Sequence, residues 1–109
     1  MEYAAEQGDI ILLEGKRPAL VVSNNTFNRF TNLAILCPIT KTAKGFPLHV
    51  PLDENTKTKG VIMCEQGKSL DLSVKDVVFL EKIPADILEE VVDIYIGIVE
   101  VIRPETYTT

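Results

Sequence analysis

GKRPALVVS, residues 15–23, and PITKTAKGFP, residues 38–47, are the two most informative stretches of this chain. Each predicts a β-strand with a cation or a hydroxyl at one end. Pro18 opens the first strand because proline is not tolerated within a central one, so Arg17 lies at its start. The second stretch follows the apolar run 33–37, a strand that we expect to end at Pro38. Together the two stretches supply guanidinium, hydroxyl and ammonium groups, a set suited to holding phosphate.

The remaining apolar runs predict a mainly β fold. Short β-branched or alternating segments indicate strands at 9–13, 48–52, 60–65 and 76–83, with a short extended piece at 68–71. After Pro84, apolar residues recur every three to four positions, which predicts a helix of roughly 18 residues closed by Pro104. Short strands, short turns and one C-terminal helix predict a small, partly open barrel, in a single domain spanning residues 1–109.

The apolar stripe of the predicted helix is wider than one packing face needs. Ile87, Ile94 and Ile96 extend it beyond the positions that repeat at helical spacing. The extra apolar surface predicts a second contact, such as another copy of the chain. A wholly intramolecular core is the alternative.

The charge is distributed unevenly along the chain. The net charge of −5 argues by itself against a nucleic-acid partner. However, residues 15–68 hold eight lysines and arginines against three acidic residues, a local net of +5, and both flanking segments are acidic. A basic middle segment attracts a polyanion locally while the whole molecule stays soluble. Scattered, solvated charge is the alternative interpretation.

Composition gives no indication of a metal, a cofactor or a membrane. Cys37 and Cys64 both stand in apolar runs, which predicts buried, reduced thiols. One histidine and two separated cysteines do not form a metal-ligand spacing, so we expect neither a metal nor another cofactor. The first residues are polar, and no apolar run approaches the ~20 residues of a membrane span. We therefore expect a cytoplasmic protein.

Arg17 and Thr40 are the candidate catalytic residues. Metal-free cleavage of RNA proceeds by attack of a 2′-hydroxyl on the adjacent phosphorus, and negative charge builds on the nonbridging oxygens. A guanidinium is a permanently charged donor fork for those oxygens, and a threonine hydroxyl donates one hydrogen bond more. Taken singly, Arg17 is an ordinary surface cation and Thr40 an ordinary turn hydroxyl. The functional prediction depends on their combination.

A series of motifs, in order over nearly the whole chain, resembles the MazF/PemK toxins. The motifs are QGDI at 7–10, KRPALVVS at 16–23, PIT at 38–40 with KGFP at 44–47, GVI at 60–62 with EQ at 65–66, KSLD at 68–71, and IP at 83–84. The resemblance implies an SH3-like barrel of the PemK/CcdB type that forms a homodimer. It also implies the toxin of a type II toxin–antitoxin pair, with a MazE-like antitoxin as its partner.

The activity that the resemblance implies is a metal- and ribosome-independent endoribonuclease acting on single-stranded RNA. Its products carry a 2′,3′-cyclic phosphate and a 5′-hydroxyl. The catalytic arginine and threonine of the family fall on Arg17 and Thr40.

Further residues of the motifs are candidates for binding RNA. Lysines steer phosphates, exposed aromatic rings stack on bases, and side-chain amides and carboxylates read base edges. The candidates are Lys16, Lys41, Lys44, Phe46, Glu65, Gln66, Lys68 and Asp71. Solvated turn charges and hydrogen bonding at the barrel end are the alternatives for the last four. His49 has no partner motif, so the general base stays unassigned, and we expect Phe27 and Phe30 to pack in the core.

One departure from the family pattern lies between the first two strands. Only residues 14–16 connect them, where family members have a longer loop that borders the active site. A short turn is sufficient to join two strands, so the fold prediction is unaffected. Two other functions remain open: a CcdB-like poison that binds gyrase and cuts nothing, and a barrel that binds RNA without cleaving it.

Overall fold

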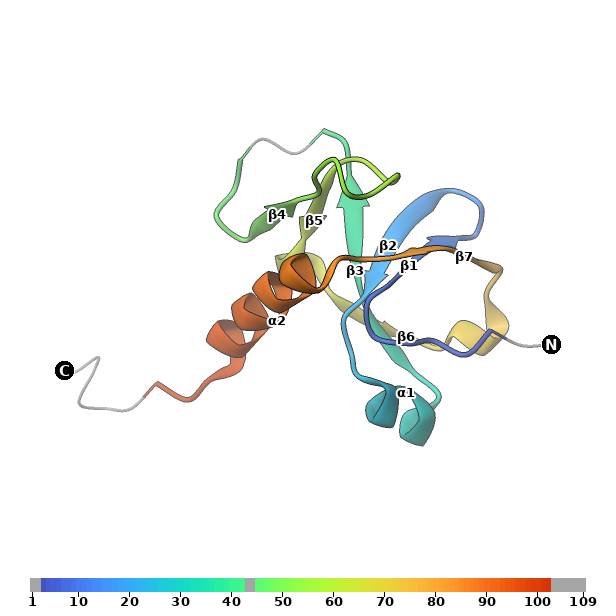
Figure 1. Cartoon of the computed structure of the whole chain (residues 1–109). Helices are drawn as coiled ribbons and strands as arrows, with labels where there is room; N and C mark the ends of the chain where they lie inside the picture. Colours follow the sequence, from blue (N-terminus) through green and yellow to red (C-terminus); the bar gives the residue numbers. More distant parts are fainter. Residues whose placement is uncertain (1–2, 43–44, 103–109) are drawn as a thin grey trace.

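The computed structural model of the chain describes residues 3–42 and 45–102 (Figure 1). All strand pairs are antiparallel, and the sheet order is β4-β5-β3-β2-β1-β7, with β6 paired to β3 outside this path. The elements are β1 (Asp9–Leu13), β2 (Arg17–Val21), α1 (Asn25–Thr31), β3 (Ala34–Thr40), β4 (His49–Pro51), β5 (Val61–Met63), the short 3-10 helix η1 (Cys64–Gln66), β6 (Lys68–Leu70), a second 3-10 helix η2 (Leu72–Val74), β7 (Val77–Lys82) and α2 (Ala85–Val99).

Strand β3 is the centre of the sheet and extends past the predicted end. Instead of stopping at Pro38, it continues to Thr40. On one side β3 pairs with β2, where Ala19 is opposite Pro38. On the other side it pairs first with β6, as far as Leu36, and then with β5, starting at Ile39. Pro38 lies where β3 changes neighbours, so its missing N–H interrupts neither ladder.

The short connection between β1 and β2 is a complete tight turn. Glu14 and Gly15 have φ values of 55° and 65°, and the backbone N–H of Lys16 donates to the carbonyl of Leu13 at 3.1 Å. Two consecutive positive φ values match the right-handed twist of the flanking strands, as in type I′ hairpin turns. A connection of three residues is therefore sufficient to join β1 to β2, and no longer loop is needed.

The two faces of the sheet carry separate hydrophobic cores. One contains Ile10, Leu20 and Ile62, and α2 packs on it through Ile87 and Val91, both buried. Figure 1 shows α2 beside β4 and β5. The other core, on the opposite face, is smaller and is built from Ile11, Ala19, Val21, Ala34, Leu36 and Leu72.

The C-terminal helix is shorter than predicted. α2 begins after Pro84 and ends at Val99, because Glu100 adopts an extended backbone with φ −69° and ψ 146°. Residues 98–102 are mostly β-branched, which lowers their helix propensity. Val101 and Ile102 are also exposed, so no packing compensates for that propensity.

The polar connection between β2 and β3 forms a helix of its own, α1. The side chain of Asn24 caps its first turn by accepting from the N–H of Phe27 at 2.9 Å, and Asn32 ends it in the left-handed conformation. The buried residue of α1 is Asn28, whose amide donates to the carbonyls of Ser23 and Ala5. Phe30 is 90% exposed, so the prediction that it packs in the core is wrong. Two residues correspond to about 200° around a helix, which directs Phe30 away from the face that Asn28 buries.

Both cysteines are buried and free, as predicted. The Sγ atom of Cys37 lies 3.1 Å from the hydroxyl of Tyr95 on α2. Within residues 3–42 and 45–102, no helix is both long and apolar enough to cross a bilayer.

Candidate active-site cleft

Strand register brings Arg17 and Thr40 together. The β2–β3 ladder pairs Val21 with Leu36 and Ala19 with Pro38. Continued by two residues toward the start of β2, the same register sets Arg17 opposite Thr40. Directly opposed residues of an antiparallel pair project from the same face of the sheet. The extended register, and the cleft that both residues line, place the two predicted catalytic residues at the same end of the barrel.

A cleft of about 590 Å³ lies over this pair. It is formed by the β1–β2 turn, the end of β3 and the β4–β5 hairpin, which gather at the top of Figure 1, and by Leu80 of β7. Its lining contains five cations and, among the described residues, no carboxylate. The cations are Lys16, Arg17, Lys41, Lys57 and Lys59.

None of these five cations forms an ion pair in the described part of the chain. The ion pairs found there join Lys82 to Glu6 and Asp9, and His49 to Glu65. In a chain with a net charge of −5, a cleft lined by five cations that form no ion pair among the described residues is a local excess of positive charge. Such a site favours a polyanion.

A second hollow of about 230 Å³ continues from the cleft. It shares Arg17 and Pro38 with the cleft and lies on the sheet face that carries Leu13, Ala19 and Leu36. Gln66 and Lys68 form its far side. The guanidinium of Arg17 therefore stands at the junction of two adjoining depressions.

Local hydrogen bonds fix the hydroxyl of Thr40. Its Oγ1 accepts from the backbone N–H of Thr42 at 3.3 Å and lies 3.1 Å from the hydroxyl oxygen of Thr42. Either hydroxyl can be the donor in this contact, so the Thr40 proton can be donated. A phosphate oxygen could take that proton in place of the Thr42 hydroxyl.

A β-bulge brings Leu80 into the cleft. β1 and β7 pair Ile10 with Glu81 and Ile11 with Phe79, so Leu80 is the extra residue. Bulges redirect side chains and are common beside functional sites. Leu80 lines the cleft and gives it an apolar wall.

Several predicted RNA-binding residues do not line either depression. Asp71 caps η2, where its carboxylate accepts from the N–H and hydroxyl of Ser73, and these bonds lower its pKa. Phe46 is half exposed and stands edge-on to His49, with 5.2 Å between ring centroids. Lys44 lies outside the described residues.

His49 has a partner that sequence reasoning missed. Its Nε2 lies 3.0 Å from a carboxylate oxygen of Glu65. Burial acts to raise the pKa of Glu65, but the hydrogen bond and charge of His49 help to lower it overall. Neither residue lines the cleft, so this pair is separate from Arg17 and Thr40.

The sequence predicted the two strands of the β4–β5 hairpin, but not that the turn between them borders the cleft. Lys57, Thr58 and Lys59 line the cleft, although their sequence context indicated only a polar turn. The charges of Lys57 and Lys59 contribute to the local net charge of +5 in residues 15–68. Their location depends on β5 pairing beside the end of β3, where Ile62 is opposite Ile39. That long-range pairing has no signature in the hairpin itself.

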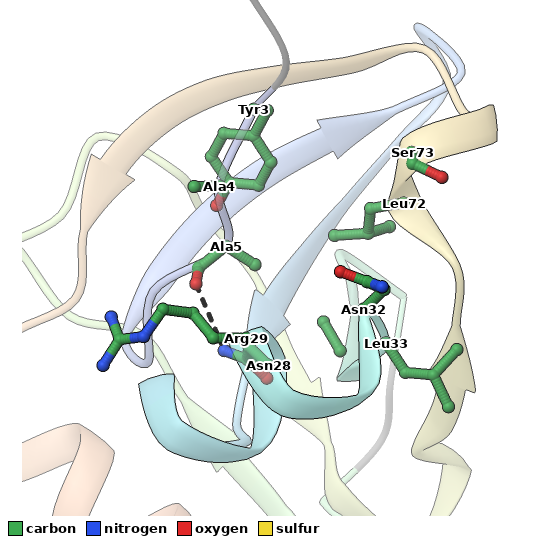
Figure 2. Close-up of a pocket in the computed structure, with 10 residues that line it drawn as sticks. Tyr3, Ala4, Ala5, Asn28, Arg29, Asn32, Leu33, Leu72 and Ser73 are labelled. Carbon is green, nitrogen blue, oxygen red and sulfur yellow. Dashed lines mark hydrogen bonds between the residues drawn. The ribbon is translucent and has the colours of Figure 1, made fainter.

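A third hollow, of about 270 Å³, lies between α1, η2 and the N-terminal segment (Figure 2). None of the predicted site residues lines it. Figure 2 shows the guanidinium of Arg29 directed away from Leu72 and Ser73, so the hollow has no cation aimed into it. Across residues 3–42 and 45–102, no three or more His, Cys, Asp and Glu side chains group as they would to hold a metal ion.

The fold and the cleft define a class: a small antiparallel β-barrel with a cation-lined cleft at the start of β2 and the end of β3. The model of the family described as PemK-like, MazF-like toxin of type II toxin–antitoxin system matches residues 6–94. The chain belongs to this family.

Sequence relatives include endoribonuclease PemK of Escherichia coli, which is 34% identical over 82 residues. That match covers 72% of this chain and 62% of the length of PemK. The endoribonuclease toxin MazF of E. coli K12 is 31% identical over 78 residues, covering 62% of this chain and 69% of MazF.

Solved structures confirm the fold prediction. MazE–MazF of Deinococcus radiodurans (crystal form I) matches with a TM-score of 0.83 and 33% identity, over 92% of this chain and 100% of that one. MazF of the same organism (crystal form I) matches with a TM-score of 0.81 and 30% identity, over 92% of this chain and 100% of that one. The mainly β barrel with a C-terminal helix is therefore the MazF fold.

Proposed function

We propose that this chain is the toxin of a type II toxin–antitoxin pair and acts as a sequence-specific endoribonuclease on single-stranded mRNA. The observation that carries the proposal is that Arg17 and Thr40 line one cleft together with four lysines and, among the described residues, no carboxylate. Single-stranded RNA presents a phosphate at every nucleotide, which matches that lining.

The reaction is intramolecular transesterification. The 2′-hydroxyl loses its proton as its oxygen attacks the adjacent phosphorus, the bond from phosphorus to the 5′-oxygen breaks, and the leaving 5′-oxygen takes up a proton. The products carry a 2′,3′-cyclic phosphate and a 5′-hydroxyl. No ribosome and no metal take part in this scheme.

Arg17 stabilises the negative charge that grows on the nonbridging oxygens. Its guanidinium stays protonated at every physiological pH, so it acts as a donor and not as a base. Removal of one such donor from an acyl-transfer site typically costs 10²–10³ in rate, about 3–4 kcal/mol. The hydroxyl of Thr40, held by Thr42, supplies a second donor to the same phosphate.

Binding partners follow from the same cleft. Lys16 and Lys41 steer phosphates beside Arg17, while Gln66 and Lys68 contact RNA in the adjoining hollow. A MazE-like antitoxin with an acidic, apolar segment would compete with RNA for this surface. The chain acts in the cytoplasm, where its mRNA substrate and antitoxin are found.

The decisive experiment uses purified protein and a long, largely unstructured RNA in EDTA, with the ends of the fragments mapped. Discrete cuts that leave 5′-hydroxyl and cyclic-phosphate ends support the proposal. Arg17→Ala should slow cleavage by orders of magnitude without loss of fold. Lys75→Ala, which removes a lysine outside the cleft lining, is the charge-matched control.

Two results would contradict the proposal. An Arg17→Ala variant that cleaves as fast as the parent would show that the assigned site is wrong. Toxicity that persists in Arg17→Ala cells and disappears in gyrase-resistant cells would identify a gyrase poison instead.

A further inference from the structure

The β4–β5 hairpin contributes two of the five cleft cations, and its role is not explained by the Arg17–Thr40 pair. Lys57, Thr58 and Lys59 line the cleft from this hairpin, across from the β1–β2 turn and Lys16. All three residues stand in the polar segment between β4 and β5. Whether the hairpin works as a binding element depends on what holds it in place.

A carboxylate of β7 fixes the tip of the hairpin. The two carboxylate oxygens of Glu81 accept separately from the backbone N–H groups of Lys57, at 3.1 Å, and Thr58, at 2.7 Å. Glu81 is paired with Ile10, directly after the bulge in β7. Both oxygens are occupied by backbone donors, and no ion pair joins Glu81 to a lysine in the described residues. The carboxylate therefore orders the hairpin through its backbone, while the positive charge of Lys57 adds an attraction at a longer distance than an ion pair.

Hydrogen bonds within the hairpin also stabilise its conformation. Thr56 is only 3% exposed, and its hydroxyl donates to the carbonyls of Thr58, at 2.7 Å, and Asp53, at 3.2 Å. The ammonium of Lys59 donates to the carbonyl of Thr56 at 2.7 Å. Lys59 is thus partly committed to the hairpin itself. Lys57 has an exposed side chain, and no hydrogen bond to its ammonium was found among the described residues.

We infer that the β4–β5 hairpin is a second phosphate-binding element, in which Glu81 holds the backbone so that Lys57 contacts an RNA phosphate next to the one cleaved at Arg17 and Thr40. This inference rests on the proposed function for its ligand. It assigns Lys57 to phosphate binding and Glu81 to positioning, with no part for either in bond breaking. A preordered lysine avoids part of the entropy cost of immobilising a long side chain and its loop when RNA binds.

The test measures RNA binding separately from cleavage. The probe is a labelled single-stranded 2′-O-methyl RNA, which lacks the attacking hydroxyl. Its sequence is the cleavage site mapped with the parent, or a mixed-sequence pool if the parent does not cleave. Binding is measured by fluorescence anisotropy over a range of salt concentrations, and each phosphate contact adds about 0.7 to the slope of log K against log salt.

We expect Lys57→Ala to reduce that slope by about 0.7 relative to the parent. The control Lys75→Ala removes the same charge outside the cleft and should leave the slope unchanged. Glu81→Ala should reproduce the Lys57→Ala slope although it removes a negative charge, and Glu81→Gln, which keeps one acceptor, should fall between. In cleavage assays Lys57→Ala should raise KM and leave kcat near the parental value.

The outcomes separate this inference from the proposed function. A Lys57→Ala slope equal to those of the parent and Lys75→Ala overturns the inference, even if the parent cleaves RNA. A parent that binds but does not cleave, with a reduced slope in Lys57→Ala, supports the phosphate site and contradicts the nuclease. Circular dichroism melting of every variant excludes unfolding as the cause.

Discussion

The backbone N–H of Thr58 lies 2.7 Å from a carboxylate oxygen of Glu81, so the tip of the β4–β5 hairpin is hydrogen-bonded to a strand 23 residues further along the chain. The second oxygen of the same carboxylate accepts from Lys57. A positioned hairpin with exposed lysines on one wall, and Arg17 with Thr40 on the other, makes the cleft a defined groove. The predictions below test its parts separately.

The first prediction concerns the release of the β4–β5 hairpin when acid protonates Glu81. Burial acts to raise the pKa of Glu81, but the hydrogen bonds from Thr58 and Lys57 outweigh it and lower the pKa below the ordinary 4.5. A depressed carboxyl pKa stabilises the folded form fully above the unfolded value, and the stabilisation is lost as pH falls through the folded value. We therefore expect the hairpin to remain held above about pH 4.5 and to be released only as the pH falls through the lowered pKa of Glu81.

Amide hydrogen exchange, expressed as protection factors, measures this release. Protection of the Thr58 N–H should fall in acid in the parent and should be nearly independent of pH in Glu81→Gln. The N–H of Leu52, which donates to the carbonyl of Gly60 at 2.9 Å within the same hairpin, is the internal control. Equal loss of protection at Leu52 and Thr58 would mean that the barrel opens as a whole.

The second prediction separates charge from geometry at the proposed catalytic pair. Arg17→Lys keeps a positive charge but loses the planar donor fork, so cleavage should still fall by about 10²-fold or more. Thr40→Ser keeps the hydroxyl and should retain most activity, whereas Thr40→Val keeps the shape and should lose it. Single-turnover rates with saturating protein are the appropriate measurement. Equal rates for Thr40→Val and the parent would remove Thr40 from the site.

Part of this site was predictable from local sequence. Arg17 followed by Pro18 marks the start of a strand, because proline restricts where a strand can begin, and Thr40 follows an apolar run that could only be a strand. Continuation of β3 through Pro38 was not predictable, since it depends on β6 ending and β5 beginning on either side of that residue. The roles of Lys57 and Glu81 depend on a contact between distant segments. Such contacts are fixed by sheet topology and not by local periodicity.

At the end of α2 the sequence predicted too long an element, whereas for β3 it predicted too short a one. Apolar spacing predicted a helix as far as Pro104, yet α2 ends at Val99. Apolar spacing shows which face of a helix would be buried if another element packed on it. Val101 and Ile102 are exposed, so no element packs on them in the described structure. The β-branched run then follows its weak helix propensity.

The third prediction concerns Gly60, which packs against the backbone of Thr40. Gly60 has φ +128°, and a Cβ atom added there would lie 2.5 Å from the carbonyl oxygen of Thr40. Gly60→Ala should therefore shift the end of β3 and reduce cleavage as well as stability. Gly97→Ala is the matched control, because a Cβ there meets nothing within 4 Å. In the exposed helix this control should stabilise the protein by about 0.5–1 kcal/mol.

Denaturant unfolding and cleavage rate, measured on both variants, distinguish the two effects. Gly60→Ala should lower the unfolding midpoint and the cleavage rate together, while Gly97→Ala should change only the midpoint, upward. Full activity in Gly60→Ala would show that the Thr40 backbone tolerates displacement and that its exact position does not limit the reaction.

The last prediction uses two isoleucines of α2 to test association. Ile87 is 5% exposed in the larger core, so Ile87→Ala should cost about 2–5 kcal/mol of folding free energy.

Ile98 is 49% exposed at the far end of the same helix, beside exposed Val99 and Val101. We expect this apolar end to contact a second copy of the chain, because contiguous exposed apolar surface marks interaction sites. Light scattering should then give about twice the 12.1 kDa mass of one chain for the parent. Ile98→Glu should shift that mass toward one chain without lowering monomer stability. A parent that is monomeric at all concentrations would contradict the assignment, and an Ile98→Glu dimer would move the interface elsewhere, with the exposed Val78 and Phe79 of β7 the next surface to mutate.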